Sequence, residues 1–202
     1  MSSDARKFAP AAARNREPIF EVLRPLLPER GLVLEIASGS GEHITGLAEG
    51  SASDVVFQPS DSDADARRSI DAWTRELGLA NVRPAILLDA ASENWAVGHA
   101  NLVFCINMIH ISPWQATEGL FRGAAGALSL DGVLFTYGPY RRGGAHTSPG
   151  NEAFDMDLRR SNPAWGIRDV ETVSDLAANC GFSAPEIVEM PANNLSLVFR
   201  RQ

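Results

Sequence analysis

The chain has 202 residues, of which 45% are hydrophobic and 21% charged, and its formal net charge is −7 at pH 7. Such a length and composition are typical of one globular domain and exclude extensive disorder. The negative charge argues against a nucleic acid as partner, because phosphate binding needs a clustered positive field.

The first part of the chain predicts a helix, a buried strand and a second helix. Apolar residues recur at helical spacing from Glu17 to Leu27, and Gly31 then opens a short apolar run over 32–37 that is typical of a buried strand. The segment 38–41 is a glycine-rich tight turn, after which helical spacing resumes over 42–49. Strands and helices continue to alternate beyond this point. We expect strands at 55–57, 82–88, 101–107 and 132–137, and helices at 63–77, 113–128 and 169–179.

Strands separated by helices of this length indicate right-handed crossovers and a parallel sheet. The last two strands, 185–190 and 195–200, are separated by only four residues, so they must form an antiparallel hairpin. The predicted fold is therefore α/β: a Rossmann-like doubly wound sheet of seven strands, mostly parallel, with a C-terminal antiparallel hairpin. We expect a single domain over 1–202, with an N-terminal helical cover at about 5–28 and a substrate-side insertion at about 139–168.

Polar residues follow four consecutive predicted strands, on the edge of the sheet where open α/β folds bind ligands. The turn 37–41 follows the first strand, and Asp61 lies 20 residues after Gly41, where a carboxylate can bond ribose hydroxyls. Asp63 could take that role, and either residue could instead cap the next helix. Asp89 and Asn107 end the third and fourth strands. The sequence lacks the Gly-Lys-Ser/Thr of a phosphate-binding loop and the third glycine of a dinucleotide fingerprint.

The spacing Glu35-x-Ala37-x-Gly39-x-Gly41 resembles the first motif of class I S-adenosylmethionine (SAM)-dependent methyltransferases, with Ala37 in place of the first glycine. Nearly the whole chain also resembles an uncharacterised family within that superfamily, domain of unknown function 938. The segments that carry this likeness are 10–19, 37–43, 58–61, 106–114 and 162–169. The resemblance implies a methyltransferase-like fold with SAM as methyl donor, and it does not supply the substrate.

The resemblance also implies a role for each matching residue. The methionine end of SAM would be held by Glu35, Ala37, Ser38, Gly39 and Gly41. Asp61 would meet the ribose, Asp89 and Ala90 the adenine, and Asn107 would lie against the methionine moiety.

On the acceptor side, His110 is the best-placed candidate base, and Tyr140 is a second catalytic candidate; a structural role for His110 is the alternative. The candidate acceptor-binding residues are Asn15, Tyr137, Asn151, Phe154, Asp155, Arg159 and Trp165. They suit a small polar or anionic acceptor, although Asp155 and Arg159 could instead form an ion pair at i, i+4 on a short helix. Of the other histidines, His43 is expected to cap or pack, and His99 and His146 to lie on the surface.

The remaining expectations concern partners and compartment. Cys105 and Cys180 lie in apolar contexts without nearby metal ligands, which predicts reduced thiols and no metal site. The polar segment 1–8 is not a secretory signal, and no apolar run is long enough to span a membrane, so we expect a cytoplasmic protein, monomer or homodimer, with a small-molecule methyl acceptor as partner. The alternative functions are a non-catalytic SAM-binding module and an NAD(P)-binding oxidoreductase.

Overall fold

A computed structural model describes residues 5–202; residues 1–4 of the polar segment 1–8 lie outside the described residues. One sheet has the strand order β3-β2-β1-β4-β5-β9-β8. Its strands are β1 (Gly31–Ile36), β2 (Val55–Asp61), β3 (Ile86–Leu87), β4 (Ala100–Ile106), β5 (Leu128–Arg142), β8 (Glu186–Met190) and β9 (Asn194–Arg200). The first five strands pair in parallel, whereas β9 is antiparallel to both β5 and β8. The predicted doubly wound sheet with a C-terminal hairpin is therefore confirmed.

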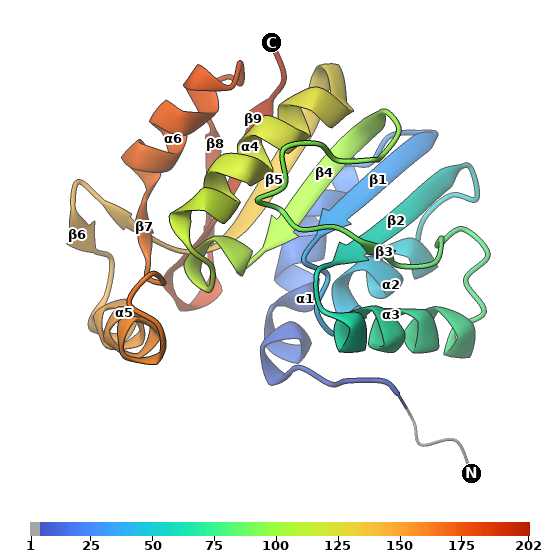
Figure 1. Ribbon diagram of the computed structural model, residues 1–202, viewed down its shortest axis with the longest axis horizontal. Coiled ribbons are helices and arrows are strands. Elements are labelled where there is room, and N and C mark those ends of the chain that lie inside the picture. Colours follow the sequence, from blue (N-terminus) through green and yellow to red (C-terminus); the bar gives the residue numbers. More distant parts are fainter. Residues whose placement is uncertain (1–4) are drawn as a thin grey trace.

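Helices cover both faces of this sheet: Figure 1 shows α4 and α6 in front of it and α1 and α2 behind it. The α-helices are α1 (Pro10–Leu23), α2 (Glu42–Glu49), α3 (Ala64–Glu76), α4 (Trp114–Ala127), α5 (Pro149–Ser161) and α6 (Val170–Asn179). Three short 3-10 turns complete the list: η1 (Arg24–Leu26), η2 (Met108–His110) and η3 (Pro191–Asn193). Within residues 5–202, no helix combines the length and the apolar character that crossing a bilayer requires.

Each face of the sheet has its own apolar core. In front, Phe121 of α4 and Val173 of α6 are fully buried against the strands. Behind, Phe20 of α1 and Leu47 of α2 are buried in the same way. Because burial of one such side chain contributes about 1.5–3 kcal/mol, these two layers hold the strand ends in fixed positions.

Helix α1 begins seven residues earlier than the predicted Glu17. Proline is favoured in the first turn of a helix, and the residues after both Pro10 and Pro18 are compatible with a helix. The structure places Pro10 in the first turn and leaves Pro18 inside the helix, where it cannot donate to the carbonyl of Arg14. As a result, α1 presents about two additional turns to the edge where the parallel strands end.

Three strands also differ in length from the prediction. Strand β2 continues to Asp61 instead of ending at residue 57. Of the expected strand 82–88, only β3 at its end forms a strand, and Val82 at its beginning forms an isolated bridge with Phe57. Pro84 lies between them and lacks the N–H that a continuous ladder needs. Strand β5 extends to Arg142, where it pairs with the short strands β6 (Ala145–His146) and β7 (Arg168–Asp169). The predicted insertion is therefore anchored to the sheet.

Candidate functional site

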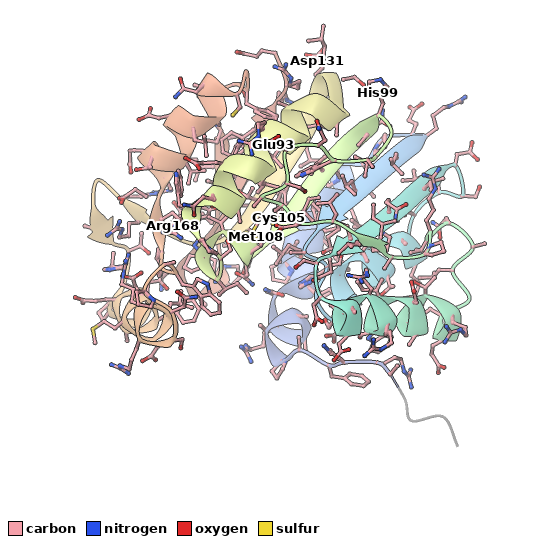
Figure 2. The ribbon with its side chains drawn as sticks, viewed as in Figure 1. Glu93, His99, Cys105, Met108, Asp131 and Arg168 are labelled. Atoms are coloured by element: carbon pink, nitrogen blue, oxygen red, sulfur yellow. The ribbon has the colours of Figure 1, made fainter. Side chains whose placement is uncertain are left out.

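Two clefts lie at the carboxyl ends of the parallel strands. The first, which we call the central cleft, has a volume of about 590 Å³. It is lined by Ile36, Ala37, Gly39, Asp61, Ser62, Leu88, Asp89, Ala90, Ala91, Ile106, Met108, Ile111, Ser112, Pro113, Gln115, Ala116 and Trp165. Figure 2 shows Met108 and Arg168 at this end of the sheet and His99 and Asp131 at the opposite end.

The second, which we call the α1 cleft, has a volume of about 620 Å³. It is lined by Ala11, Arg14, Asn15, Pro18, Asn107, Ile111, Tyr137, Pro139, Asn151, Phe154, Pro191, Ala192 and Asn194. Ile111 lines both clefts and is 46% exposed, so the two hollows adjoin at this one side chain.

The turn after β1 brings backbone directly to the central cleft. Gly39 has φ +57°, and a Cβ atom at this position would meet nothing within 4 Å, because it would point into open space. Ala37 has φ +56°, a left-handed conformation that costs an L-residue about 1–2 kcal/mol. The residue that departs from the methyltransferase motif thus holds the conformation that glycine adopts without strain.

Asp61 connects this turn to the end of β2. Its Oδ2 accepts a hydrogen bond from the backbone N–H of Gly39 at 2.9 Å, and its Oδ1 accepts one from Asp63 at 2.9 Å. Asp63 itself caps α3 by accepting from the N–H of Asp65. Asp61 and Asp63 were the two candidates for binding the ribose. In the structure Asp61 lines the central cleft, whereas Asp63 caps α3.

The end of the third predicted strand supplies Asp89 and Ala90, which both line the central cleft. Asp89 is exposed, and its Oδ1 accepts a hydrogen bond from Ala91 N–H at 2.9 Å. Within residues 5–202, its other carboxylate oxygen accepts no hydrogen bond.

Glu35 lies beneath the turn and is only 1% exposed. Burial raises the pKa of its carboxyl well above the ordinary value; a hydrogen bond involving Ser38 opposes this rise and the nearby Asp61 adds to it. Among residues 5–202, its Oε2 has no hydrogen-bond partner. A buried acceptor without a partner is costly, so this atom would be satisfied by a ligand that brings a donor.

Asn107 ends β4 in a left-handed conformation, with φ +62°, and its N–H donates to Tyr137 O at 2.8 Å. It lines the α1 cleft and not the central cleft, so it lies on the predicted acceptor side rather than the cofactor side. The chain reverses here into η2, and this reversal turns His110 into the protein interior, where it is 1% exposed. A Cβ atom on Gly138 would lie 2.2 Å from His110 Nε2, which shows how closely the ring is enclosed.

The two predicted catalytic residues lie against each other inside the protein. The rings of His110 and Tyr140 form an edge-to-face contact at 5.0 Å, and Tyr140 is completely buried. Burial, reinforced by Arg168, lowers the pKa of His110 to about 3, and within the described chain neither ring nitrogen has a partner. The Tyr140 hydroxyl is hydrogen-bonded to Thr136 Oγ1 at 2.8 Å, and burial raises its pKa. The structure therefore brings neither residue to the surface of the two clefts.

A buried chain of side chains connects α2 to the α1 cleft. His43 Nε2 lies 2.9 Å from Asn15 Oδ1, and burial, with a further contribution from Arg16, lowers the pKa of His43 to about 4. Burial raises the pKa of Tyr137, and the side chain of Asn15 acts in the opposite direction. His43 thus packs in the interior, and Asn15 and Tyr137 line the cleft as predicted acceptor-side residues.

The insertion contributes to both clefts. Asn151 and Phe154 of α5 line the α1 cleft, where Asn151 Nδ2 donates to Thr147 Oγ1 and to Asn193 O, both at 2.9 Å. Trp165 lines the central cleft, on the predicted cofactor side rather than the acceptor side.

Asp155 and Arg159 form the ion pair that the sequence left as an alternative. Arg159 Nε lies 2.9 Å from Asp155 Oδ2, and Ile167 N–H donates to Asp155 Oδ1 at 2.6 Å. Burial acts to raise the pKa of Asp155, but the hydrogen bonds from Arg159 and Ile167 outweigh it and the pKa is lowered. His146 lies 3.7 Å from the same carboxylate and is partly buried, so its assignment to the surface was wrong, whereas His99 is exposed as expected.

Sequence reasoning predicted Asn15 of α1 on the acceptor side but missed the other residues of the same helix face. Ala11, Arg14, Asn15 and Pro18 all line the α1 cleft, and they follow each other at i, i+3, i+4 and i+7, the spacing of one helical face. This signal was available in the sequence once the helix was known to begin at Pro10. Among residues 5–202, no three His, Cys, Asp or Glu side chains form a group that could hold a metal ion.

Comparisons with known proteins agree with this geometry. Residues 6–201 match the family described as "Protein of unknown function (DUF938)". An O-methyltransferase family protein from Burkholderia thailandensis superposes with a TM-score of 0.81 and 15% identity, over 95% of this chain and 57% of that one.

Two further solved structures are similar. For the pyocyanin biosynthetic protein PhzM the TM-score is 0.72 and the identity 21%, over 91% of this chain and 54% of that one. CalO1, a methyltransferase in calicheamicin biosynthesis, was solved in its SAH-bound form. It superposes with a TM-score of 0.74 and 12% identity, over 95% of this chain and 54% of that one. The chain thus spans a little over half the length of these proteins, and at such identities the likeness is one of fold.

Proposed function

The chain belongs to the DUF938 family, and we propose that it is a SAM-dependent methyltransferase whose acceptor is a small molecule. The observation that carries this proposal is the meeting of two clefts at Ile111. One cleft follows the strand ends that bind nucleotide-like ligands in open α/β sheets, and the other provides separate room for a second molecule. The methyltransferases of similar fold, one of them in an SAH-bound form, support the same reaction class.

The residues of the central cleft fit SAM. Gly39 lets the ligand approach the backbone. Asp61 uses its two oxygens for two N–H groups, and a carboxylate has about four lone-pair sites, so acceptors remain for ribose hydroxyls. Glu35 lies beneath the turn and outside the cleft lining, and its unpartnered Oε2 would be satisfied by an ammonium group such as that of the methionine moiety. Asp89 and Ala90 would hold the adenine.

Bound SAM would supply a methyl group on a positively charged sulfur, which is transferred by in-line displacement. The contribution of this chain is to align the acceptor and to exclude water, which accounts for most of the rate in such a reaction. Met108, Ile111 and Trp165 supply apolar surface around the central cleft. Among the described residues that line the α1 cleft there is no His, Cys, Lys, Asp or Glu, so no general base is assigned there.

Calorimetric titration of the full chain with S-adenosylhomocysteine (SAH) tests the proposal. We expect binding by the wild type and a large loss in Gly39→Asn, because asparagine tolerates φ +57° and its amide would fill the cleft. Gly143→Asn is the matched control, since Gly143 has φ +56°, equally open surroundings and no place in either cleft. Absence of SAH binding by the wild type at millimolar concentration would overturn the proposal.

A second measurement separates catalysis from binding alone. Conversion of SAM to SAH is followed with a panel of small-molecule acceptors. Turnover that is lost in Gly39→Asn and kept in Gly143→Asn is the expected result. SAH binding without SAM consumption across the panel would instead favour a non-catalytic SAM-binding module.

A further inference from the structure

We propose that the α1 cleft selects a small molecule that carries a carboxylate, held by the guanidinium of Arg14 and the hydroxyl of Tyr137. This inference rests on the methyl-transfer function proposed above and names its acceptor class. The sequence suggested an anionic acceptor on the strength of Arg159, but Arg159 is paired with Asp155. The positive charge in the cleft comes from a different element, α1.

The first argument is charge. Of the described residues that line the α1 cleft, Arg14 alone is ionised at neutral pH, and the lining contains no carboxylate to neutralise it. Two neighbouring arginines, Arg16 and Arg24, both pair with Glu17 at 3.4 and 3.8 Å. Within residues 5–202, Arg14 forms neither an ion pair nor a hydrogen bond. An arginine without a counter-ion beside a cleft is suited to bind a carboxylate, with which its fork of donors can form two hydrogen bonds.

The second argument is the direction of the hydrogen bonds that reach Tyr137. The neutral His43 faces Asn15 Oδ1, an acceptor, so His43 Nε2 must carry the ring proton. This leaves the amide N–H₂ of Asn15, a donor, for the side chain of Tyr137, whose pKa Asn15 acts to lower. The hydroxyl hydrogen of Tyr137 is then free to donate into the cleft that this residue lines.

The third argument concerns the rest of the wall. Ala11, Pro18, Ile111, Pro139 and Phe154 give the cleft a largely apolar surface, which suits an apolar molecular body beside the anionic group. Because a carboxylate has already lost its proton in solution, its recognition needs no base from a wall that offers none.

Ligand-observed NMR titrations in saturating SAH test this inference with three matched pairs: benzoate and benzamide, 4-hydroxybenzoate and 4-hydroxybenzamide, nicotinate and nicotinamide. We expect at least one carboxylate to bind about tenfold more tightly than its amide, a typical gain for a charge-assisted pair. Arg14→Gln should abolish this preference. Arg24→Gln, which removes the same charge outside the cleft, should retain it.

The hydrogen-bond chain is tested with two substitutions of one residue. Glutamine at position 43 can still donate to Asn15 Oδ1, whereas leucine cannot. We expect His43→Gln to retain the carboxylate preference and His43→Leu to reduce it about threefold, as Tyr137→Phe should also do. Circular dichroism melting of each variant confirms that it is folded.

The possible failures are distinguishable. If the wild type binds SAH but no carboxylate more tightly than its amide, or if Arg14→Gln keeps the preference, the inference is overturned and the proposed function stands. If the wild type does not bind SAH, the proposed function fails, and the inference fails with it.

Discussion

The backbone N–H of Gly39 donates to Oδ2 of Asp61 at 2.9 Å, which fixes the turn after β1 to the end of β2. The same carboxylate lines the central cleft, so one side chain both shapes the turn and faces the ligand. Hydrogen bonds to a charged group contribute about 1.5–3 kcal/mol each. The turn and the ligand-facing acid are thus energetically coupled.

We therefore expect Asp61→Asn to weaken SAH binding by about 10- to 100-fold, measured by calorimetry, because the amide replaces one acceptor with a donor. Asp63→Asn is the control, since asparagine caps helices about as well as aspartate and Asp63 lies outside the central cleft. Equal losses in the two variants would contradict the assignment of Asp61.

Ala37 provides a test of backbone strain. Its φ of +56° costs alanine about 1–2 kcal/mol, whereas glycine loses about 0.5–1 kcal/mol through its more flexible unfolded chain. Ala37→Gly should therefore raise the free energy of unfolding by about 0.5–1 kcal/mol, and Ala37→Val should lower it. Urea denaturation measures both changes. A destabilised glycine variant would show that the turn is not strained at this residue.

The sequence predicted that Gly39, Asp61 and Asp89 meet at one edge of the sheet, because their meeting depends on topology. Alternating strands and helices imply a parallel sheet, and a parallel sheet brings the residues after each strand to one edge. Gly39, Asp61 and Asp89 follow from this rule without knowledge of any side-chain contact, and all three line the central cleft.

The acceptor side depends on details that periodicity does not specify. Whether His110 faces a cleft is decided by the left-handed turn at Asn107, which directs the histidine against Tyr140 instead. Whether Arg159 meets a ligand is decided by the 2.9 Å contact with Asp155. Of the face of α1 only Asn15 was predicted, because the apolar periodicity that indicated the helix begins near Glu17, whereas the helix itself begins at Pro10.

Glu35 should oppose folding at neutral pH and assist binding. Burial raises its pKa in the folded protein above the ordinary value of 4.5, so the stability associated with its protonated form is present below pH 4.5 and is lost as the pH rises. Glu35→Gln, which cannot ionise, should therefore be more stable than the wild type at pH 8. The difference should vanish below pH 4.5, as measured by urea denaturation.

The same variant should bind SAH more weakly, because the amide removes the carboxylate that would face an ammonium group. A variant that is more stable and binds SAH as tightly as the wild type would show that Glu35 acts only on the fold.

His43 should make stability depend on pH in the acidic range. Its pKa is lowered to about 4 in the folded protein from 6.5, so between these values the unfolded chain binds a proton that the folded protein does not. Stability is therefore lost as the pH falls from about 6.5 to 4, by about 3 kcal/mol for this group. His43→Gln keeps a donor for Asn15 without titrating and should lose correspondingly less stability than the wild type over this range. Parallel urea titrations at pH 7 and pH 4.5 measure the difference, and identical pH dependence in the two proteins would refute it.

Asp155 tests whether the insertion binds the acceptor through its charges or uses them to hold itself together. Asp155 is 6% exposed, and its carboxylate accepts hydrogen bonds from Arg159 on the same helix and from Ile167 in the segment before β7. Asp155→Asn therefore weakens one contact within α5 and one that fixes α5 to that segment. We expect a loss of about 2 kcal/mol in the free energy of unfolding, with SAH affinity unchanged.

Asp157→Asn is the matched control for this prediction. Asp157 lies two residues further along α5 and pairs with Arg160 at 2.8 Å, but both side chains are about two-thirds exposed. Exposed pairs contribute about 0–1 kcal/mol, so its replacement should change stability much less. Similar stability losses in the two variants would show that burial of the Asp155 pair adds nothing. If Asp155→Asn were fully stable but lost turnover, the carboxylate of Asp155 would be assigned to acceptor binding. We do not expect this result, because the carboxylate is paired with Arg159 and Ile167.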